Sequence, residues 1–146
     1  MARASATRFR LIFPWRRSAA TTVALALTLL CSDRAFAVPP SVEATLACAP
    51  AGGVMVCVVQ LEATLGAHVT WAEATIVSAP PFARPVRLRS TYEGSKTDPR
   101  LLLPLVLSGT GNGELAVLTR AVVCADDGTS CPKASKLLHA TLHAPR

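Results

Sequence analysis

The stretch ELAVLTRAVVCADDGTSCPKASKLLHATL, Glu114 to Leu142, decides the fold. Apolar and polar residues alternate on both sides of Asp127-Gly128, and a period of two is the pattern of a half-buried β-strand. Asp-Gly is a strong signal for a two-residue type I′ turn, because both central residues of that turn need positive φ. The stretch therefore predicts two antiparallel strands that form a hairpin.

This hairpin predicts a disulfide. Pairing outward from the turn sets Cys124 directly opposite Cys131. Facing Cα atoms of an antiparallel pair lie about 4.5–5.5 Å apart, which is within the range that a disulfide accepts. The same argument at Gly52-Gly53 sets Cys48 opposite Cys57. We therefore expect two local cross-strand bonds, although four cysteines formally allow three pairings.

The rest of the chain continues the pattern of short apolar or alternating runs between Gly, Pro and Asp breaks. Strands are expected at Val42–Cys48, Val54–Ala63, Val69–Ser78, Val86–Tyr92, Leu101–Leu107, Glu114–Ala125 and Lys136–Leu142. About seven strands at this spacing indicate an all-β antiparallel sandwich. Abundant Ala and Leu would also suit helices. Pro104 disfavours a helix in LLLPLVL and favours an edge strand or a bulge there.

The N-terminus has the layout of a secretory signal peptide. Five arginines precede the first acidic residue, the run Ala19–Cys31 is uncharged and mostly apolar, and Ala35-Phe36-Ala37 suits a signal peptidase. We expect cleavage after Ala37 and a secreted or periplasmic location. Three alternatives stay open: a lipoprotein anchored at Cys31, twin-arginine export directed by Arg16-Arg17, and an uncleaved membrane anchor.

Residues 38–146 then form one expected domain, and most of the net charge of +6 belongs to the export segment. Residues 1–37 hold six of the 15 Lys and Arg and one of the nine acids, which leaves nine basic and eight acidic residues. A net charge of about +1, with no basic stripe interleaved with aromatics, argues against nucleic-acid binding.

The second cysteine pair has two interpretations. As a staple, its short loop would contribute roughly 2–3 kcal/mol, which is useful to a small exported domain. As an exchangeable bond, it would lie near a sheet end where a partner can reach it, beside Pro132, which lacks a backbone donor. Asp126 and Asp127 are expected to raise nearby thiol pKa values, which slows thiolate attack. These arguments leave both interpretations open, whereas Cys48–Cys57 is expected to be structural.

The segments LLLPLVL (Leu101–Leu107) and CADDGTSCP (Cys124–Pro132) resemble the N-terminal periplasmic domain of the DsbD thiol–disulfide interchange protein family. The resemblance covers most of residues 54–142, and its last third is the specific part. It implies an immunoglobulin-like sandwich that exchanges electrons with periplasmic partners. By the same resemblance, Cys131 would form mixed disulfides, and Cys124 would be the more buried resolving cysteine.

The resemblance also implies a cap and a set of partners. Tyr92, before Glu93-Gly94, matches a loop that shields the family's cysteine pair, although an ordinary strand-end tyrosine is an equal interpretation. The partners would be thioredoxin-like periplasmic proteins or a membrane electron carrier. The sequence departs from the family in a longer hairpin, in the additional pair Cys48 and Cys57, and in having no membrane electron-carrying segment.

We therefore expect an exported thiol–disulfide exchange domain that needs no cofactor, because the two sulfurs carry the electrons. The alternative is a non-catalytic periplasmic binding or scaffold module with two structural disulfides. No metal site is expected: His139 and His143 would share a strand face but lie roughly 13 Å apart. Trp71, spaced alternately with Val69 and Glu73, is expected to pack in a central strand.

Overall fold

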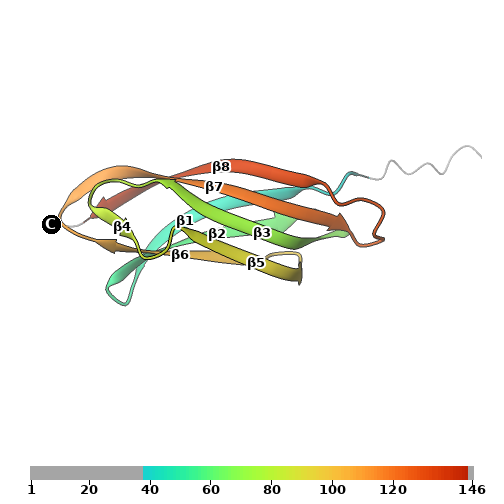
Figure 1. Cartoon of the computed structure of the whole chain (residues 1–146), viewed down its shortest axis with the longest axis horizontal. Helices are drawn as coiled ribbons and strands as arrows, with labels where there is room; N and C mark the ends of the chain where they lie inside the picture. Colours follow the sequence, from blue (N-terminus) through green and yellow to red (C-terminus); the bar gives the residue numbers. More distant parts are fainter. Residues whose placement is uncertain (1–37, 145–146) are drawn as a thin grey trace, which may run out of the picture. The chain divides into compact units, whose positions relative to one another are not determined.

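The computed structural model describes residues 38–144, so the predicted signal peptide at residues 1–37 lies outside the described residues. The described chain forms two four-stranded antiparallel sheets that make a sandwich (Figure 1). The strands are β1 (Val42–Ala51), β2 (Val54–Ala63), β3 (Ala67–Ser78), β4 (Ala83–Pro85), β5 (Arg89–Lys96), β6 (Arg100–Leu107), β7 (Gly111–Ala125) and β8 (Lys133–Ala144). This is the all-β class that the alternating pattern predicts. Within residues 38–144, no helix is long and apolar enough to cross a bilayer.

The first sheet has the strand order β1-β2-β6-β4, and the second sheet has the order β5-β3-β7-β8. The β1–β2 hairpin turns at Gly52-Gly53, where Ala51 pairs with Val54 and the two glycines have φ values of 57° and 84°. Two successive positive φ values are the type I′ geometry expected for this glycine pair. The β1–β2 turn and the β7–β8 connection lie at opposite ends of the sandwich (Figure 1).

The core lies between the two sheets and follows the period of two along each strand. In β6, Leu101, Leu103 and Leu105 are at most 1% exposed, whereas Leu102 and Val106 on the other face are 46% and 44% exposed. The second sheet presents its own buried row from β7 to the same interior. Because a slip of one residue would turn each such row outward, burial fixes the register of these strands.

Pro104 lies within β6, which has a strand on both sides, so the expected edge strand is wrong. On one side β6 pairs with β2, and on the other it pairs with only the three residues of β4. The Pro104 carbonyl accepts a hydrogen bond from Val86 N at 3.0 Å on the β4 side. A residue's N–H and C=O point to the same side of a strand, so the donor that proline lacks faces the end of the short β4.

The expected strand at 86–92 begins only at Arg89, and residues 86–88 connect the short strand β4 to β5. Val86 N donates to the first sheet at Pro104, whereas the Leu88 carbonyl accepts a bond from Ile76 N of the second sheet at 2.8 Å. The chain therefore crosses between sheets near Arg87, and the alternation of residues 86–92 belongs to two different surfaces. This crossing makes the additional short strand β4 and moves the start of β5 to Arg89.

Replacing Leu103 with alanine tests the inward row of β6. The free energy of unfolding is expected to fall by about 2–5 kcal/mol, because the fully buried side chain leaves a cavity. The matched control is Leu102→Ala on the exposed face, with an expected loss of about 1 kcal/mol or less. Urea unfolding of both variants measures the difference, and equal losses would contradict the assigned register.

Candidate functional site

The β7–β8 hairpin brings Cys124 and Cys131 together. The register pairs Val122 with Lys133, and beyond that pair Ala125 N donates to Ser130 O at 2.9 Å. Cys124 and Cys131 lie opposite each other between these positions and form a disulfide with a Cα–Cα distance of 4.0 Å. Val123 N also donates to Pro132 O at 3.1 Å, so hydrogen-bonded pairs lie on either side and Cys124–Cys131 is a non-hydrogen-bonded pair, the position at which facing side chains approach most closely. The bond predicted from the sequence is therefore present.

The turn that joins the two strands is not the predicted two-residue turn. Gly128 N donates to Ala125 O at 2.9 Å, so Asp126 and Asp127 are the central residues and the connection is longer. Gly128, the one glycine of this loop, has a positive φ of 71°, a conformation that glycine adopts without steric cost. The Asp127 carboxylate closes the turn by accepting from Thr129 N at 2.9 Å and from the Thr129 hydroxyl at 2.6 Å. These hydrogen bonds to the charged form lower the pKa of Asp127 below its ordinary value of 3.8.

Asp126 also has a partner, which the sequence did not reveal. Its carboxylate lies 2.8 Å from Nδ1 of His68, and Asp126 N donates to Gly66 O at 2.9 Å. Both carboxylates of the loop are therefore engaged, Asp126 with an imidazole and Asp127 with Thr129.

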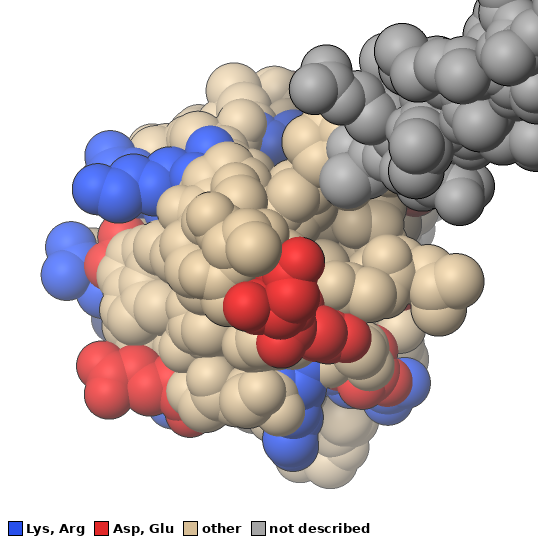
Figure 2. All heavy atoms as spheres, turned by 90° about the vertical axis from the view of Figure 1, so that its right-hand side faces the viewer, with Lys and Arg blue, Asp and Glu red and all other residues tan. Residues whose placement is uncertain are grey.

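The two sulfurs of the hairpin disulfide have different surroundings. Cys124 is 9% exposed and lies opposite His68 on β3, with the Thr70 hydroxyl 3.8 Å from its Sγ. Cys131 is exposed, as is the loop that precedes it. Figure 2 views this end of the sandwich and shows acidic side chains near its centre. A thiol from another molecule can therefore approach Cys131 and not Cys124.

A β-bulge on β3 lies beside Cys124. The pairing of β3 with both β5 and β7 shifts between Val69 and Trp71, which leaves Thr70 as an extra residue on the outer face. Val69 is fully buried, whereas Trp71 beyond the bulge is half-buried on the outer face beside Val122. Trp71 does lie in a central strand, as expected, but it does not share the face of Val69, because one inserted residue reverses the alternation.

The second disulfide, Cys48–Cys57, differs in its depth. The two residues pair in the β1–β2 register with a Cα–Cα distance of 4.0 Å. Cys57 is fully buried and pairs on its other side with Leu103, and Cys48 packs against the same core. Cys48 is only partly buried, but neither sulfur belongs to an exposed residue as Cys131 does, so this pair fits the structural role expected for it.

The structure does not bring Tyr92 to the cysteine pair. Tyr92 pairs with the buried Ala72 and packs against the core, on the inner face of the second sheet. Cys124 and the outward-facing Val122 share the other face of that sheet. Glycine is required at position 94, because a Cβ there would lie 2.6 Å from the Tyr92 hydroxyl. That hydroxyl is buried without a hydrogen-bond partner. Tyr92 therefore packs in the core and does not cover the hairpin disulfide.

The two C-terminal histidines bind neighbouring side chains instead of each other. His139 Nδ1 contacts the Glu114 carboxylate, and His143 Nδ1 lies 2.8 Å from the Asn112 side-chain oxygen. Across residues 38–144, no cluster of three or more His, Cys, Asp or Glu has the arrangement of a metal site. The hairpin disulfide with His68, Asp126 and Thr70 is therefore the candidate site.

Comparisons with known proteins give no guide to this site. Neither the models of protein families nor the curated proteins nor the solved structures gave a match to this chain. The likeness to the DsbD family therefore stays a resemblance of the residues quoted above.

The hydrogen bonds of Asp127 are expected to make the hairpin sensitive to acid. Because the folded-state pKa lies below 3.8, the charged carboxylate stabilises the fold above that value and loses this contribution as pH falls through the folded-state pKa. The difference in unfolding free energy between the wild type and Asp127→Ala should therefore be smaller at about pH 2.5 than near neutrality. Urea unfolding at both pH values measures it.

Asp127→Asn is the matched control, because the amide keeps an acceptor oxygen and does not titrate. Its difference from Asp127→Ala should not change over the same range. If the difference in unfolding free energy between the wild type and Asp127→Ala also stays constant with pH, the charge of the carboxylate does not stabilise this turn.

Proposed function

We propose that this protein is an exported thiol–disulfide exchange domain in which Cys131 is attacked first and Cys124 resolves. One observation carries the proposal: within a single bond, Cys131 is exposed and Cys124 is 9% exposed. An exposed disulfide at the rim of a sheet is open to exchange, and the difference in access decides which sulfur reacts. The resemblance to the DsbD periplasmic domain supports the same assignment. The signal-peptide pattern supports a secreted or periplasmic location.

The chemistry needs only the two sulfurs and a partner dithiol. A partner thiolate attacks Cys131 Sγ, the disulfide breaks, and Cys124 Sγ leaves with the bonding electron pair and takes a proton. The partner's second thiolate then attacks the partner's own sulfur in the mixed disulfide and releases Cys131 as a thiolate. The partner dithiol is oxidised to a disulfide and the hairpin disulfide is reduced by two electrons, and the reverse sequence reduces a partner's disulfide. Thioredoxin-like proteins or a membrane electron carrier would fit as partners.

His68 and Thr70 act on the buried leaving sulfur in this proposal. Residues that face each other across an antiparallel pair have Cβ atoms about 4.5–5.5 Å apart, so His68 lies next to Cys124. The Asp126 carboxylate at 2.8 Å holds the His68 ring in place. The Thr70 hydroxyl, now 3.3 Å from Val122 O, can turn to donate to a Cys124 thiolate. A proton donor beside the leaving group speeds its departure.

One observation favours the alternative, a non-catalytic binding or scaffold module whose disulfides are both structural. The half-buried Trp71 faces outward beside a hollow on the second sheet, and binding there would require no bond to open. In that case the hairpin disulfide would only stabilise the rim.

Trapping of mixed disulfides separates these two functions. Each variant changes one cysteine of the pair to serine. Cys124→Ser leaves the exposed Cys131 as a free thiol, and Cys131→Ser leaves the buried Cys124. Cys124→Ser should form a mixed disulfide with an oxidised thioredoxin-like probe at least about tenfold faster than Cys131→Ser, because only Cys131 is accessible. Mass spectrometry of alkylated samples measures both rates. Equal rates, or no adduct from either variant, would favour the scaffold.

Replacing His68 with glutamine tests the proton donor. Opening of the hairpin disulfide by mercaptoethanol should slow by a factor of about ten to a hundred, because the Cys124 thiolate loses the acid beside it. His139→Gln is the control, since it also removes a histidine bound to a carboxylate, on β8 of the same sheet. Equal rates for the two variants would show that His68 has no part in opening the bond.

A further inference from the structure

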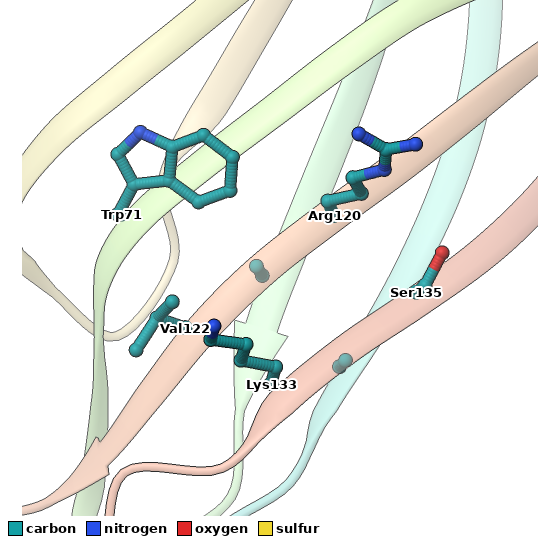
Figure 3. A pocket seen from close by; sticks show the side chains of 7 residues that line it. Trp71, Arg120, Val122, Lys133 and Ser135 are labelled. Atoms are coloured by element: carbon teal, nitrogen blue, oxygen red, sulfur yellow. The ribbon is translucent and has the colours of Figure 1, made fainter.

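A hollow of about 500 Å³ lies on the outer face of the second sheet, beside the hairpin disulfide. Figure 3 shows Trp71, Arg120, Val122, Lys133 and Ser135 around it. They come from three neighbouring strands, β3, β7 and β8, where Trp71 pairs with Val122 and Val122 with Lys133. The hollow therefore has an aromatic side chain on one side and two basic side chains, with small or apolar residues between them.

The hollow and the disulfide share one face at successive positions. Cys124 is two residues beyond Val122 on β7, and Cys131 is two residues before Lys133 on the facing segment. Side chains two residues apart on a strand point the same way and lie roughly 7 Å apart. A chain that brings a cysteine to Cys131 and continues across this face therefore passes over the hollow.

The charges of the hollow are unmatched. None of the ion pairs among residues 38–144 includes Arg120 or Lys133, and both side chains are exposed. Glu73 pairs with Arg120 in the strand register, but its carboxylate is held by Arg89 Nε at 3.3 Å and by the Thr75 hydroxyl at 3.3 Å. Two cations beside the hollow are thus available to a negative group from outside.

Two sets of acids lie near this face: Asp126 and Asp127 are in the hairpin loop beyond the disulfide, and Glu93 is on the far side of the tryptophan. Glu93 of β5 pairs with Trp71 in the register, and β5 lies on the side of β3 opposite to β7. Glu93 is not part of the lining of the hollow. A carboxylate above Arg120 and Lys133 would therefore meet favourable charge, and an apolar group beside it would meet Trp71 and Val122.

We infer that this hollow docks an extended peptide segment of the redox partner, with a carboxylate side chain about three residues from the partner's reactive cysteine. The spacing follows from geometry, because about three residues of extended chain span the roughly 10 Å from Cys131 to the middle of the hollow. This inference rests on the proposed exchange function and adds the recognition that selects the partner. Arg120 and Lys133 bind the carboxylate, and Trp71 packs against the apolar part of the segment.

Peptide thiols test the inference in the full-length chain. Two short peptides, blocked at both ends, carry a cysteine and either glutamate or glutamine about three residues from it, in both chain directions. The glutamate peptide should form the mixed disulfide with Cys131 about three- to tenfold faster at low salt. This advantage should shrink in high salt, because exposed charge pairs are screened.

Substitutions of the cations identify the contact. In the double variant Arg120→Gln with Lys133→Gln, the glutamate and glutamine peptides should react at equal rates. The control is Arg84→Gln with Arg100→Gln, which removes the same charge from exposed positions on the first sheet. An unchanged preference in the first double variant, or a lost preference in the control, would overturn the inference.

Two further measurements keep the docking site separate from the exchange function. Mercaptoethanol is neutral and small, so its reaction does not depend on the hollow. If it opens the bond in none of the variants, the exchange function is rejected and the docking site is not. Peptides with serine in place of cysteine would then test docking through Trp71 fluorescence, in a Trp15→Phe background that leaves one tryptophan. Tighter binding of the glutamate peptide supports the site. Two results would overturn the inference because they point to another occupant. One is that acetylglutamate alone binds as tightly as the glutamate peptide; the other is that the protein self-associates and Trp71→Phe abolishes this.

Discussion

The structure depends on one constraint, the register of the β7–β8 hairpin. That register is set by burial: Leu115 and Val117 of β7 and Leu138 and Leu142 of β8 must all face the core, and a slip of one residue would turn one strand's row outward. The same alternation puts Cys124 and Cys131 opposite each other on the outer face. The core therefore brings the sulfurs together, and the disulfide fastens an arrangement that packing has already chosen. Everything proposed for this site, from the attacked sulfur to the hollow beside it, follows from that position.

The surroundings of the bond come from β3, the strand next to β7. Its bulge at Thr70 gives the outer face a hydroxyl beside Cys124 and turns Trp71 away from the core. Without the extra residue, Trp71 would lie on the same face as Val69 and be buried. One irregularity thus shields one sulfur and builds a wall of the neighbouring hollow. The core bond at Cys57 has none of these features, so the two disulfides of this domain are suited to different roles.

Local sequence predicted what local geometry controls. The glycine pair in the β1–β2 turn and the alternation around Asp127 and Gly128 were sufficient for both disulfides, because each joins residues within one hairpin. The same information could not place His68 beside Cys124 or Asp126, because both contacts depend on the pairing of β3 with β7, and His68 and Asp126 are 58 positions apart in the sequence. The family resemblance offered Tyr92 as a cap, beside the equal interpretation of a strand-end tyrosine, because a family motif specifies order along the chain and not the face of a sheet. The crossing near Arg87 was invisible for a similar reason: an alternating run does not show which sheet each half joins.

We expect the hairpin disulfide to open under mild reducing conditions while the Cys48–Cys57 disulfide stays closed. Equilibration of the protein in glutathione redox buffers, followed by alkylation and mass spectrometry of each cysteine, gives the reduction potential of both bonds. We expect a value between about −270 and −120 mV for Cys124–Cys131, the range of exchange proteins, and a much lower value for Cys48–Cys57. A Cys124–Cys131 potential below about −300 mV would contradict it and leave a structural staple.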